Sequence, residues 1–265
     1  MNPLHFCVES VAFWAPALPG WLIARAAFRG EGAPVDPPAK RPAPAILAPA
    51  ERRRTPDSVA LALEVAAAAV RDSGRDAATL PSVFVSAHGD LAVNDYMCAT
   101  LADQPTLISP TRFHNSVHNA AAGYWTIATG CRAASTALTA FDTSFAAGLL
   151  EAATQCVADE RAVLLVAYDV QAVGAIATVT QSDGLLAAAV VLAPAPSTGS
   201  PGKPGFQASL IAGPAAAAPL RSSAAKALAG NAMADALPFF EALALATDRP
   251  LDLPLTRTLT LRLTP

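Results

Sequence analysis

The hydrophobic positions of the chain fall into short runs separated by polar and turn-forming residues. Mainly apolar runs rich in Val, Leu and Phe predict strands, and the continuous ones are typical of strands buried on both faces. Residues 162–167 are the clearest case, since all of them are apolar. Strands are expected over residues 6–13, 83–86, 135–139, 162–167, 185–192, 208–211 and 259–263.

A different pattern predicts helices between these strands. Thr55, Pro56 and Asp57 combine a capping side chain with a proline in the first helical turn, and apolar residues continue up to Gly74. We therefore expect a mostly buried helix that ends at Gly74. Further helices are expected over residues 91–101, 124–129 (the end or the continuation of a helix), 144–157 and about 223–246.

Strands and helices alternate, which predicts an α/β layered fold with a mainly parallel or mixed sheet. Proline and glycine mark the connections. Residues 15–20 are expected to form a turn, residues 30–51 an extended loop and residues 195–205 a linker. The consecutive arginines 52–54, beside the proline-rich stretch, are expected in a solvated loop.

The composition is unusually poor in charge. Charged residues make up 15% of the 265 residues, against about 25% in ordinary soluble domains, and hydrophobic residues make up 53%. Such a chain has ample material for a core, so wholesale disorder is excluded. Two explanations of the charge deficit remain open: a GC-rich coding bias, which also fits 63 Ala and 15 Arg against 3 Lys, and a large surface buried against a partner.

Charge, apolar runs and cysteines exclude several function classes. The net charge of −3 without a basic stripe argues against nucleic-acid binding. No apolar run is long enough to cross a bilayer, and the first residues lack the pattern of a signal peptide, so we expect a cytoplasmic protein. Cys7, Cys98, Cys131 and Cys156 lie far apart, so buried thiols are expected rather than a zinc site or disulfides.

One stretch carries specific information. Residues 116–123 read Ser-Val-His-Asn-Ala-Ala-Ala-Gly, Thr126-Ile127 and Gly130 follow, and residues 144–152 read Ser-Phe-Ala-Ala-Gly-Leu-Leu-Glu-Ala. This arrangement resembles the N-terminal half of the thiolase-fold β-ketoacyl synthases. It is most similar to the short, synthase-like chain length factors of aryl polyene pigment clusters. The resemblance covers about residues 4–195.

The resemblance implies a single thiolase-like domain over residues 1–265, with α-β-α-β-α layers. Residues 4–195 would form the N-terminal synthase-like half, and residues 206–265 a shortened C-terminal portion. Carried forward from Asn119 without a gap, the family pattern puts Asp142 where a condensing synthase has its nucleophilic cysteine. There a helix N-terminus stabilises a thiolate, whereas an aspartate is a good helix cap and a poor acyl acceptor. We expect Asp142 to be such a cap.

Two further features of the resemblance argue against catalysis. Condensing synthases use a His-His or His-Asn pair, C-terminal to the nucleophile, to stabilise the enolate and the oxyanion. Here no histidine follows His118, and Asn231 is the only asparagine after position 142. The C-terminal half is also short. The sequence therefore predicts a non-catalytic chain length factor that pairs with an active β-ketoacyl synthase and shapes the tunnel for an acyl chain carried by acyl carrier protein.

The family's dimer contact gives candidate residues for the interface and the tunnel. They are His118, Asn119, Gly123, Trp125, Phe141, Asp142 and Phe145. Among these, the bulky side chains of Phe141 and Trp125 are expected to limit chain length. No cofactor and no metal is expected. A half-sized subunit that hides an apolar face against its partner would also explain the charge deficit.

Several alternatives remain open. His114 and His118, four residues apart, would suit a metal if they shared a helix face, but no third ligand lies near them. Cys131, with His118 as base, is a conceivable displaced nucleophile. The His88-Gly89-Asp90 stretch is either a site at the end of a strand or a turn that starts a helix. With Cys131 or Asp142 as its reactive group, the chain would be a short acyltransferase or decarboxylase that acts on acyl carrier protein substrates. A homodimeric acyl-chain binding protein is a third possibility.

Overall fold

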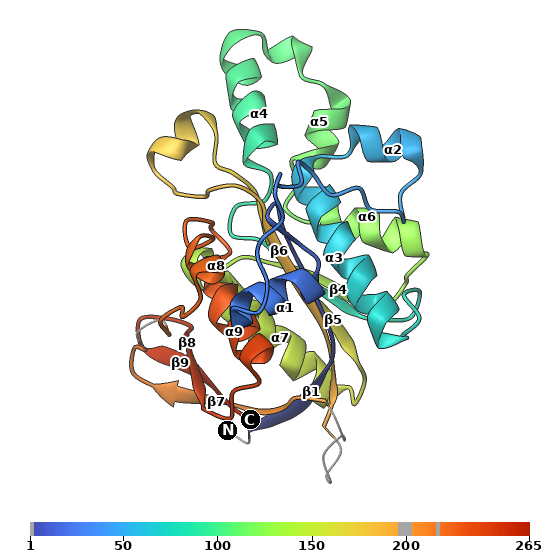
Figure 1. Ribbon diagram of the computed structural model, residues 1–265. Helices are drawn as coiled ribbons and strands as arrows, with labels where there is room; N and C mark the ends of the chain where they lie inside the picture. The colour runs from blue at the N-terminus through green and yellow to red at the C-terminus, as the bar shows by residue number, and fades with distance from the viewer. Residues whose placement is uncertain (1–2, 196–202, 216–217) are drawn as a thin grey trace.

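One mixed sheet forms the centre of the molecule, described by a computed structural model for residues 3–195, 203–215 and 218–265 (Figure 1). Its strands follow the order β4-β3-β5-β6-β1-β7-β9-β8, and the short β2 pairs with β1. Their bounds are Leu4–Ala15 (β1), Leu18–Pro19 (β2), Ser82–Val85 (β3), Ser135–Leu138 (β4), Val163–Asp169 (β5), Leu186–Pro194 (β6), Gly205–Ala212 (β7), Leu251–Pro254 (β8) and Leu259–Thr264 (β9).

The strand directions explain how the two parts of the chain join. β3 is parallel to β4 and β5, whereas β6 is antiparallel to β5 and to β1. β1 pairs with β6 along most of its length, and its first residues also pair with β7 on the other side. The C-terminal portion therefore extends the same sheet through the first strand of the chain, and the mixed sheet expected from the sequence is confirmed.

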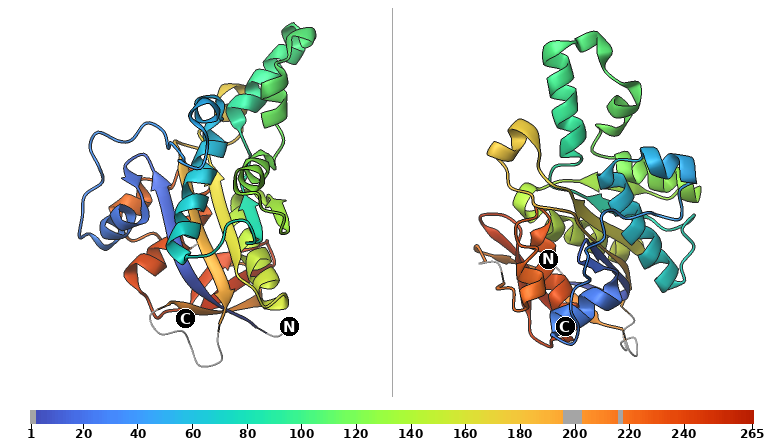
Figure 2. Two further views of the ribbon diagram at one scale, coloured as in Figure 1. Left: turned by 90° about the vertical axis from the view of Figure 1, so that its right-hand side faces the viewer. Right: turned by 45° about the horizontal axis from the view of Figure 1, so that its top comes forward.

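Helices cover both faces of the five strands β4, β3, β5, β6 and β1 (Figures 1 and 2). On one face lie α3 (Asp57–Ser73) and α6 (Ala120–Thr129). On the other face lie α1 (Trp21–Arg29), α7 (Ser144–Ala158), α8 (Ser223–Lys226) and α9 (Leu237–Leu245). Neighbouring side chains of a strand point to opposite faces, so Phe84 packs in the first core and Val83 and Val85 in the second.

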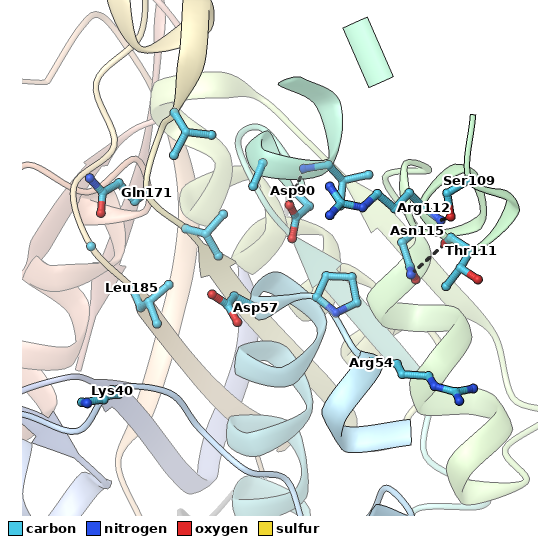
Figure 3. A pocket seen from close by; sticks show the side chains of 16 residues that line it. Lys40, Arg54, Asp57, Asp90, Ser109, Thr111, Arg112, Asn115, Gln171 and Leu185 are labelled. Atoms are coloured by element: carbon cyan, nitrogen blue, oxygen red, sulfur yellow. Dashed lines mark hydrogen bonds between the residues drawn. The ribbon is translucent and has the colours of Figure 1, made fainter. Parts of the chain in front are cut away.

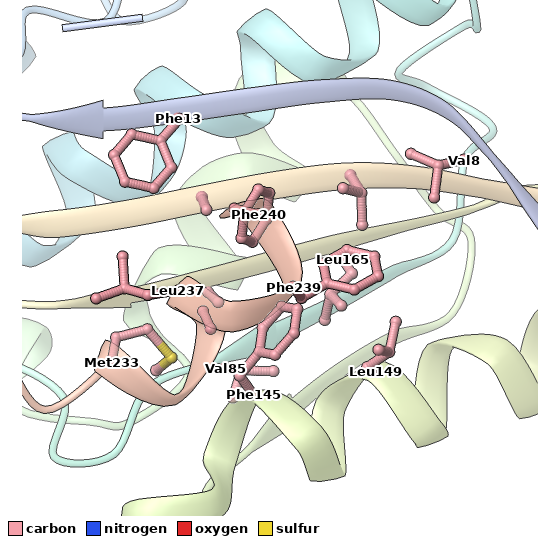
Figure 4. Close-up of a cluster of buried hydrophobic side chains, with 14 of the residues drawn as sticks. Val8, Phe13, Val85, Phe145, Leu149, Leu165, Met233, Leu237, Phe239 and Phe240 are labelled. Atoms are coloured by element: carbon pink, nitrogen blue, oxygen red, sulfur yellow. The ribbon is translucent and has the colours of Figure 1, made fainter. Parts of the chain in front are cut away.

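Figure 4 shows an aromatic cluster in the second core, and Phe206 connects this cluster to the C-terminal strands. The ring of Phe239 lies 5.4 Å from that of Phe145, 5.5 Å from that of Phe240 and 5.6 Å from that of Phe206 on β7. Phe240 in turn lies 5.9 Å from Phe13 on β1. These rings place α7 and α9 between the main sheet and the β7-β9-β8 strands, which gives helix, sheet, helix and sheet layers.

Helices of the described chain cover the C-terminal strands on one face only, and two helices project from the other end of the molecule. In the described part of the chain no helix lies on the outer face of β7, β9 and β8 (Figures 1 and 2). At one end, α4 (Leu91–Asp103) and α5 (Pro110–Asn115) project away from the sheet. The short helix η1 (Pro105–Leu107) connects them, and η3 (Gly174–Thr178) contacts α4.

Several expected elements differ in the structure. The arginines at 52–54 form the last turn of a short helix, α2 (Pro49–Arg54), rather than a loop. The helix expected around 223–246 is broken into α8, η4 (Ala234–Ala236) and α9, because Gly230 and Pro238 interrupt it. The sequence pattern did not predict α1, α5 or β8. Most of the expected linker 195–205 lies outside the described residues.

Of the four cysteines, three are buried as expected, but Cys98 on α4 is exposed. Burial raises the pKa of the Cys156 thiol to about 12. The Cys156 thiol is therefore a poor nucleophile, and Cys98 is the one cysteine that is exposed to solvent.

Two helical glycines provide a matched test of this packing. A methyl group at Gly148 of α7 would overlap the side chain of Val85 on β3, whereas nothing lies within 4 Å of a methyl group at Gly123 of α6. Gly148→Ala should lower the free energy of unfolding by about 1–3 kcal/mol because the core is overpacked. Gly123→Ala should raise it by about 0.5–1 kcal/mol through helix propensity. Denaturant unfolding measures both, and equal effects would contradict the close contact of α7 with the sheet.

Candidate functional site

The candidate site is the sharp turn between β4 and α7. After β4 the chain forms the short helix η2 (Phe141–Thr143) and enters α7 at Ser144. Phe141 has a φ of 51°, in the left-handed region that non-glycine residues rarely occupy. Its side chain is 67% exposed and lies beside the ring of His88, 6.4 Å away. The turn thus presents an aromatic side chain at the position where the backbone is most strained.

Side-chain hydrogen bonds hold this turn in place. The Ser144 hydroxyl donates to the Phe141 carbonyl oxygen (2.7 Å) and accepts from the Ala140 amide (2.9 Å). The Thr139 hydroxyl donates to the Ala87 carbonyl oxygen (2.9 Å) and so ties the turn to the end of β3. The strained conformation is therefore fixed by its own hydroxyl groups and by the neighbouring strand.

Asp142 does not cap α7, so the expected cap role is wrong. The N-cap residue is Thr143, whose side chain makes no capping hydrogen bond, and Asp142 is exposed. The Phe145 amide in the first turn of α7 instead donates to Asp235 Oδ2 at 2.8 Å. Asp235 belongs to η4, 90 residues later, so the cap comes from the C-terminal portion. Sequence reasoning missed this residue, because no local pattern links it to α7.

The environment of Asp235 favours its protonated form. Burial raises the pKa of this carboxyl to about 8, although hydrogen bonds from the amides of Phe145 and Ala146 lower it. The second oxygen, Oδ1, is buried without a partner among the described residues. The Asp235 residue lines a cavity of about 270 Å³ together with Asp142, Ala146 and Leu253.

A second buried carboxyl, that of Asp169, lies beside the residues that follow β3. It stands at the end of β5 and accepts from the Ser86 hydroxyl (2.7 Å) and from the amides of Ala87 (2.8 Å) and His88 (3.3 Å). Burial raises its pKa to about 6. Burial also lowers the pKa of His88, which faces Thr180 at 3.0 Å. These groups join the ends of β3 and β5, so the His88-Gly89-Asp90 stretch forms a turn that starts α4, with Asp90 as its cap.

Two of the seven candidate residues of the interface are buried within this chain, and the other five are at least partly accessible. Trp125 and Phe145 are buried in the two cores of this chain, so neither side chain is available for direct contact with a partner. This corrects the expectation for Trp125 as a bulky limit to chain length. His118 places Nε2 2.9 Å from the Ser86 carbonyl oxygen. Asn119 and Gly123 line a cavity of about 340 Å³ between α2 and α6.

The other candidates from the sequence are not brought together. His114 lies in α5 and His118 beyond its end, so the two do not share a helix face. The His114 ring instead lies 6.1 Å from that of Tyr124. Cys131 is buried in the loop after α6, and its thiol points to the Leu80 carbonyl oxygen at 3.5 Å. His118 is thus paired with β3 and does not activate Cys131.

A larger cavity than these two lies elsewhere, where α3, α4 and α5 begin (Figure 3). It measures about 710 Å³. Asp90 accepts from the Ser58 hydroxyl at 2.7 Å, and Asn115 donates to the Thr111 carbonyl oxygen at 3.0 Å. A lining with many charged groups does not suit an apolar acyl chain. The charged and polar residues that line it include Lys40, Arg54, Asp57, Asp90, Arg112 and Asn115.

Comparison with protein families identifies the fold. Residues 29–248 match the family described as β-ketoacyl synthase, N-terminal domain. The chain belongs to the β-ketoacyl synthase family. The match runs through most of the chain, from α1 to α9, and so includes part of the C-terminal portion that the resemblance in sequence did not cover. No curated protein matches this synthase-family chain.

Solved structures agree with this family. The ketosynthase in complex with its chain length factor from Xenorhabdus doucetiae matches with a TM-score of 0.75 at 21% identity, over 99% of this chain and 100% of that one. The ishigamide ketosynthase/chain length factor matches with a TM-score of 0.70 at 14% identity, over 99% of both chains. A β-ketoacyl synthase from Burkholderia phymatum STM815 matches with a TM-score of 0.59 at 11% identity, over 94% of this chain and 71% of that one.

The layered thiolase-like fold of this synthase-family chain is therefore confirmed, but the outermost helical layer of the expected α-β-α-β-α order is not seen among the described residues (Figures 1 and 2). Among the described residues, no helix has the length and hydrophobicity needed to cross a membrane. Nor do three or more His, Cys, Asp or Glu side chains gather there in a way that would hold a metal ion.

The raised pKa of Asp235 predicts how stability depends on pH. Folded Asp235 keeps its proton to about pH 8, whereas in the unfolded chain it loses it near pH 4, so unfolding releases a proton in this range. Stability should therefore fall as the pH rises. Between pH 6.5 and 8, where Asp169 and His88 contribute little, Asp235→Asn should remove a large part of this decrease in stability. The part removed corresponds to roughly 4 °C in Tm.

Thermal melts across this range measure the slope. Asp103 is an exposed carboxylate at the end of α4, and Asp103→Asn is the matched control that should leave the slope unchanged. An unchanged slope in Asp235→Asn would show that the carboxyl is not buried as described.

Proposed function

We propose that the chain is the non-catalytic chain length factor of a cytoplasmic β-ketoacyl synthase, paired with an active synthase subunit that receives acyl chains from acyl carrier protein. One observation carries the proposal: the strand-to-helix turn of a synthase fold is intact, but it presents Phe141 and Asp142 and no thiol. The likeness of the whole chain to complexes of a ketosynthase with its chain length factor supports it. We extend this to aryl polyene or related polyketide chains.

The pairing surface would include β4, the edge strand of the sheet. The Ser82 amide donates to the Ala134 carbonyl oxygen and the Ser86 amide to that of Leu138, so these residues of the β4 segment direct their backbone groups to β3. In a parallel ladder, alternate residues face alternate sides. The backbone groups of Ser135 and Ala137 therefore face the free edge. An edge with unpaired donors and acceptors is suited to pairing with a strand of another chain.

Exposed apolar side chains lie on the segments that precede and follow β4, and α6 contacts β4 directly. Phe113 and Val117 lie in and after α5, Ile127 lies on α6, and Phe141 lies in the turn after β4. Ile127 is 79% exposed. Apolar side chains gathered around an open sheet edge are typical of a surface that is buried in an assembly. Such a surface favours the partner explanation of the charge deficit over coding bias alone.

A matched pair of charge substitutions tests this surface. Ile127→Asp places a charge beside the open edge. Leu22→Asp is the control: it places the same charge on α1, which covers the opposite face of the sheet, at a side chain that is 76% exposed. Ile127→Asp should weaken copurification with a coexpressed synthase at least tenfold, because a charge would be buried without a partner. Leu22→Asp should have no effect. Equal retention of the synthase by both variants would place the interface elsewhere.

The strand edge is tested separately by proline. Ala137→Pro removes an amide that faces the open edge and leaves the hydrogen bonds to β3 in place. We expect the variant to fold but to lose the synthase on size exclusion. Leu138→Pro, which removes an amide facing β3, should lower Tm as well. Retained pairing in Ala137→Pro would exclude strand addition at β4.

The alternative is a short acyltransferase or decarboxylase. The buried position of Cys131 and the exposed carboxylate of Asp142 both disfavour it. Incubation of the isolated chain with acyl-carrier substrates, followed by intact mass spectrometry, separates the two functions. A chain length factor gives no acyl adduct, and an adduct on Asp142 or Cys131 would establish the enzyme.

Phe141 is the remaining candidate for the residue that limits chain length. Its ring is exposed beside the proposed interface, where an acyl chain in the partner's tunnel would meet it. Phe141→Ala keeps the Cβ atom and hence the backbone preference, so it isolates the effect of the ring. The complex should then make longer products, measured by mass spectrometry, and an unchanged product distribution would reject this role.

A further inference from the structure

The first turn of α7 contains backbone amides that a helix leaves without partners. In a helix of this length, these amides and the helix dipole form a natural site for an anion. Here the amide of Phe145 donates to Asp235 Oδ2 at 2.8 Å, and the amide of Ala146 also stabilises the charged form of that carboxyl. A side chain of the same protein thus occupies the place at which a bound oxyanion or thiolate would be held.

The surroundings of Asp235 keep other ligands from replacing it. Its Oδ1 atom is buried and has no partner among the described residues, and the small cavity beside it is lined mainly by apolar groups, including Ala146, Leu220 and Leu253. The other titratable groups that act on it are Asp142 and Asp169, both acidic. No cation is among them to draw the carboxyl away from α7. The aromatic cluster also fixes α9, which follows η4 directly.

We propose that Asp235 silences the turn, as a positioning residue that takes the amides required for acyl transfer. The inference rests on the proposed non-catalytic function and gives it a second cause, independent of the missing thiol. A cysteine at position 141 or 142 would then be an ordinary thiol, because the amides that would stabilise its thiolate are already occupied. Removal of the Asp235 carboxyl should restore that stabilisation.

The test introduces a thiol with and without the carboxyl. Phe141→Cys and Asp142→Cys are made separately in the full chain that also carries Cys98→Ser, so that the three remaining native thiols are buried. Iodoacetamide alkylation, followed by intact mass spectrometry from pH 5.5 to 9, gives the pKa of each new thiol. With Asp235 present, we expect a thiol pKa of about 8.5 or higher.

In the Asp235→Ala background, at least one of the two thiols should have a pKa about one unit lower, which is a tenfold faster alkylation at low pH. Asp235→Asn is the matched control: its side-chain oxygen can still accept from the amides, so the thiol pKa should stay near that of the chain with Asp235. Circular dichroism verifies that each variant is folded.

Two results would overturn the proposal. One is a thiol pKa below about 7.5 while Asp235 is in place. This measurement needs no substitution at Asp235, so it remains decisive even if Asp235→Ala does not fold. The other is an unchanged thiol pKa at both positions in folded Asp235→Ala. Copurification with the synthase is measured in parallel for the chain that carries Cys98→Ser alone, in which Phe141, Asp142 and Asp235 are intact. Absence of pairing by this chain would instead contradict the proposed function.

Discussion

The position of α7 between two layers of strands constrains the rest of the structure. The buried face of α7 must be nearly flat to pack on the sheet, and the amides of its buried first turn need partners within the protein. Gly148 has no side chain, so α7 can pack closely against Val85 on β3. Asp235 from the C-terminal portion accepts a hydrogen bond from the first turn of α7. The two parts of the chain therefore depend on each other: the first part supplies the helix and the second part completes it.

The same arrangement gives the buried polar groups partners within the chain. Asp169 and Asp235 both have raised pKa values because they are buried, and both accept hydrogen bonds from backbone amides at the ends of elements. In an enzyme, buried carboxyls beside a strained turn would suggest acid or base catalysis. Here each one has a structural partner, and the strained turn carries a phenyl ring. The residues thus preserve the shape of a synthase site while their contacts remain within the chain.

The sequence predicted the elements whose signal is local and missed those that depend on distant residues. The helix that ends at Gly74 and the strand over residues 162–167 were predicted because their apolar patterns are long and continuous. α1 was missed because proline-rich turns enclose it, and the helix near the C-terminus was predicted as continuous despite Gly230 and Pro238. Asp142 was expected to cap α7 because it is adjacent in sequence. The capping carboxyl group, that of Asp235, comes from a contact that no sequence spacing encodes.

The backbone at Phe141 has a consequence for how this position should vary. A side chain with a Cβ atom costs about 1 kcal/mol or more in the left-handed conformation, which glycine adopts freely. Folding alone would thus favour glycine there, and a library of variants screened only for thermal stability should accumulate glycine at 141. A library screened instead for product length in the assembled synthase should keep a large ring. The difference between the two enriched residues would measure how much stability the protein gives up to keep an aromatic group at the end of β4.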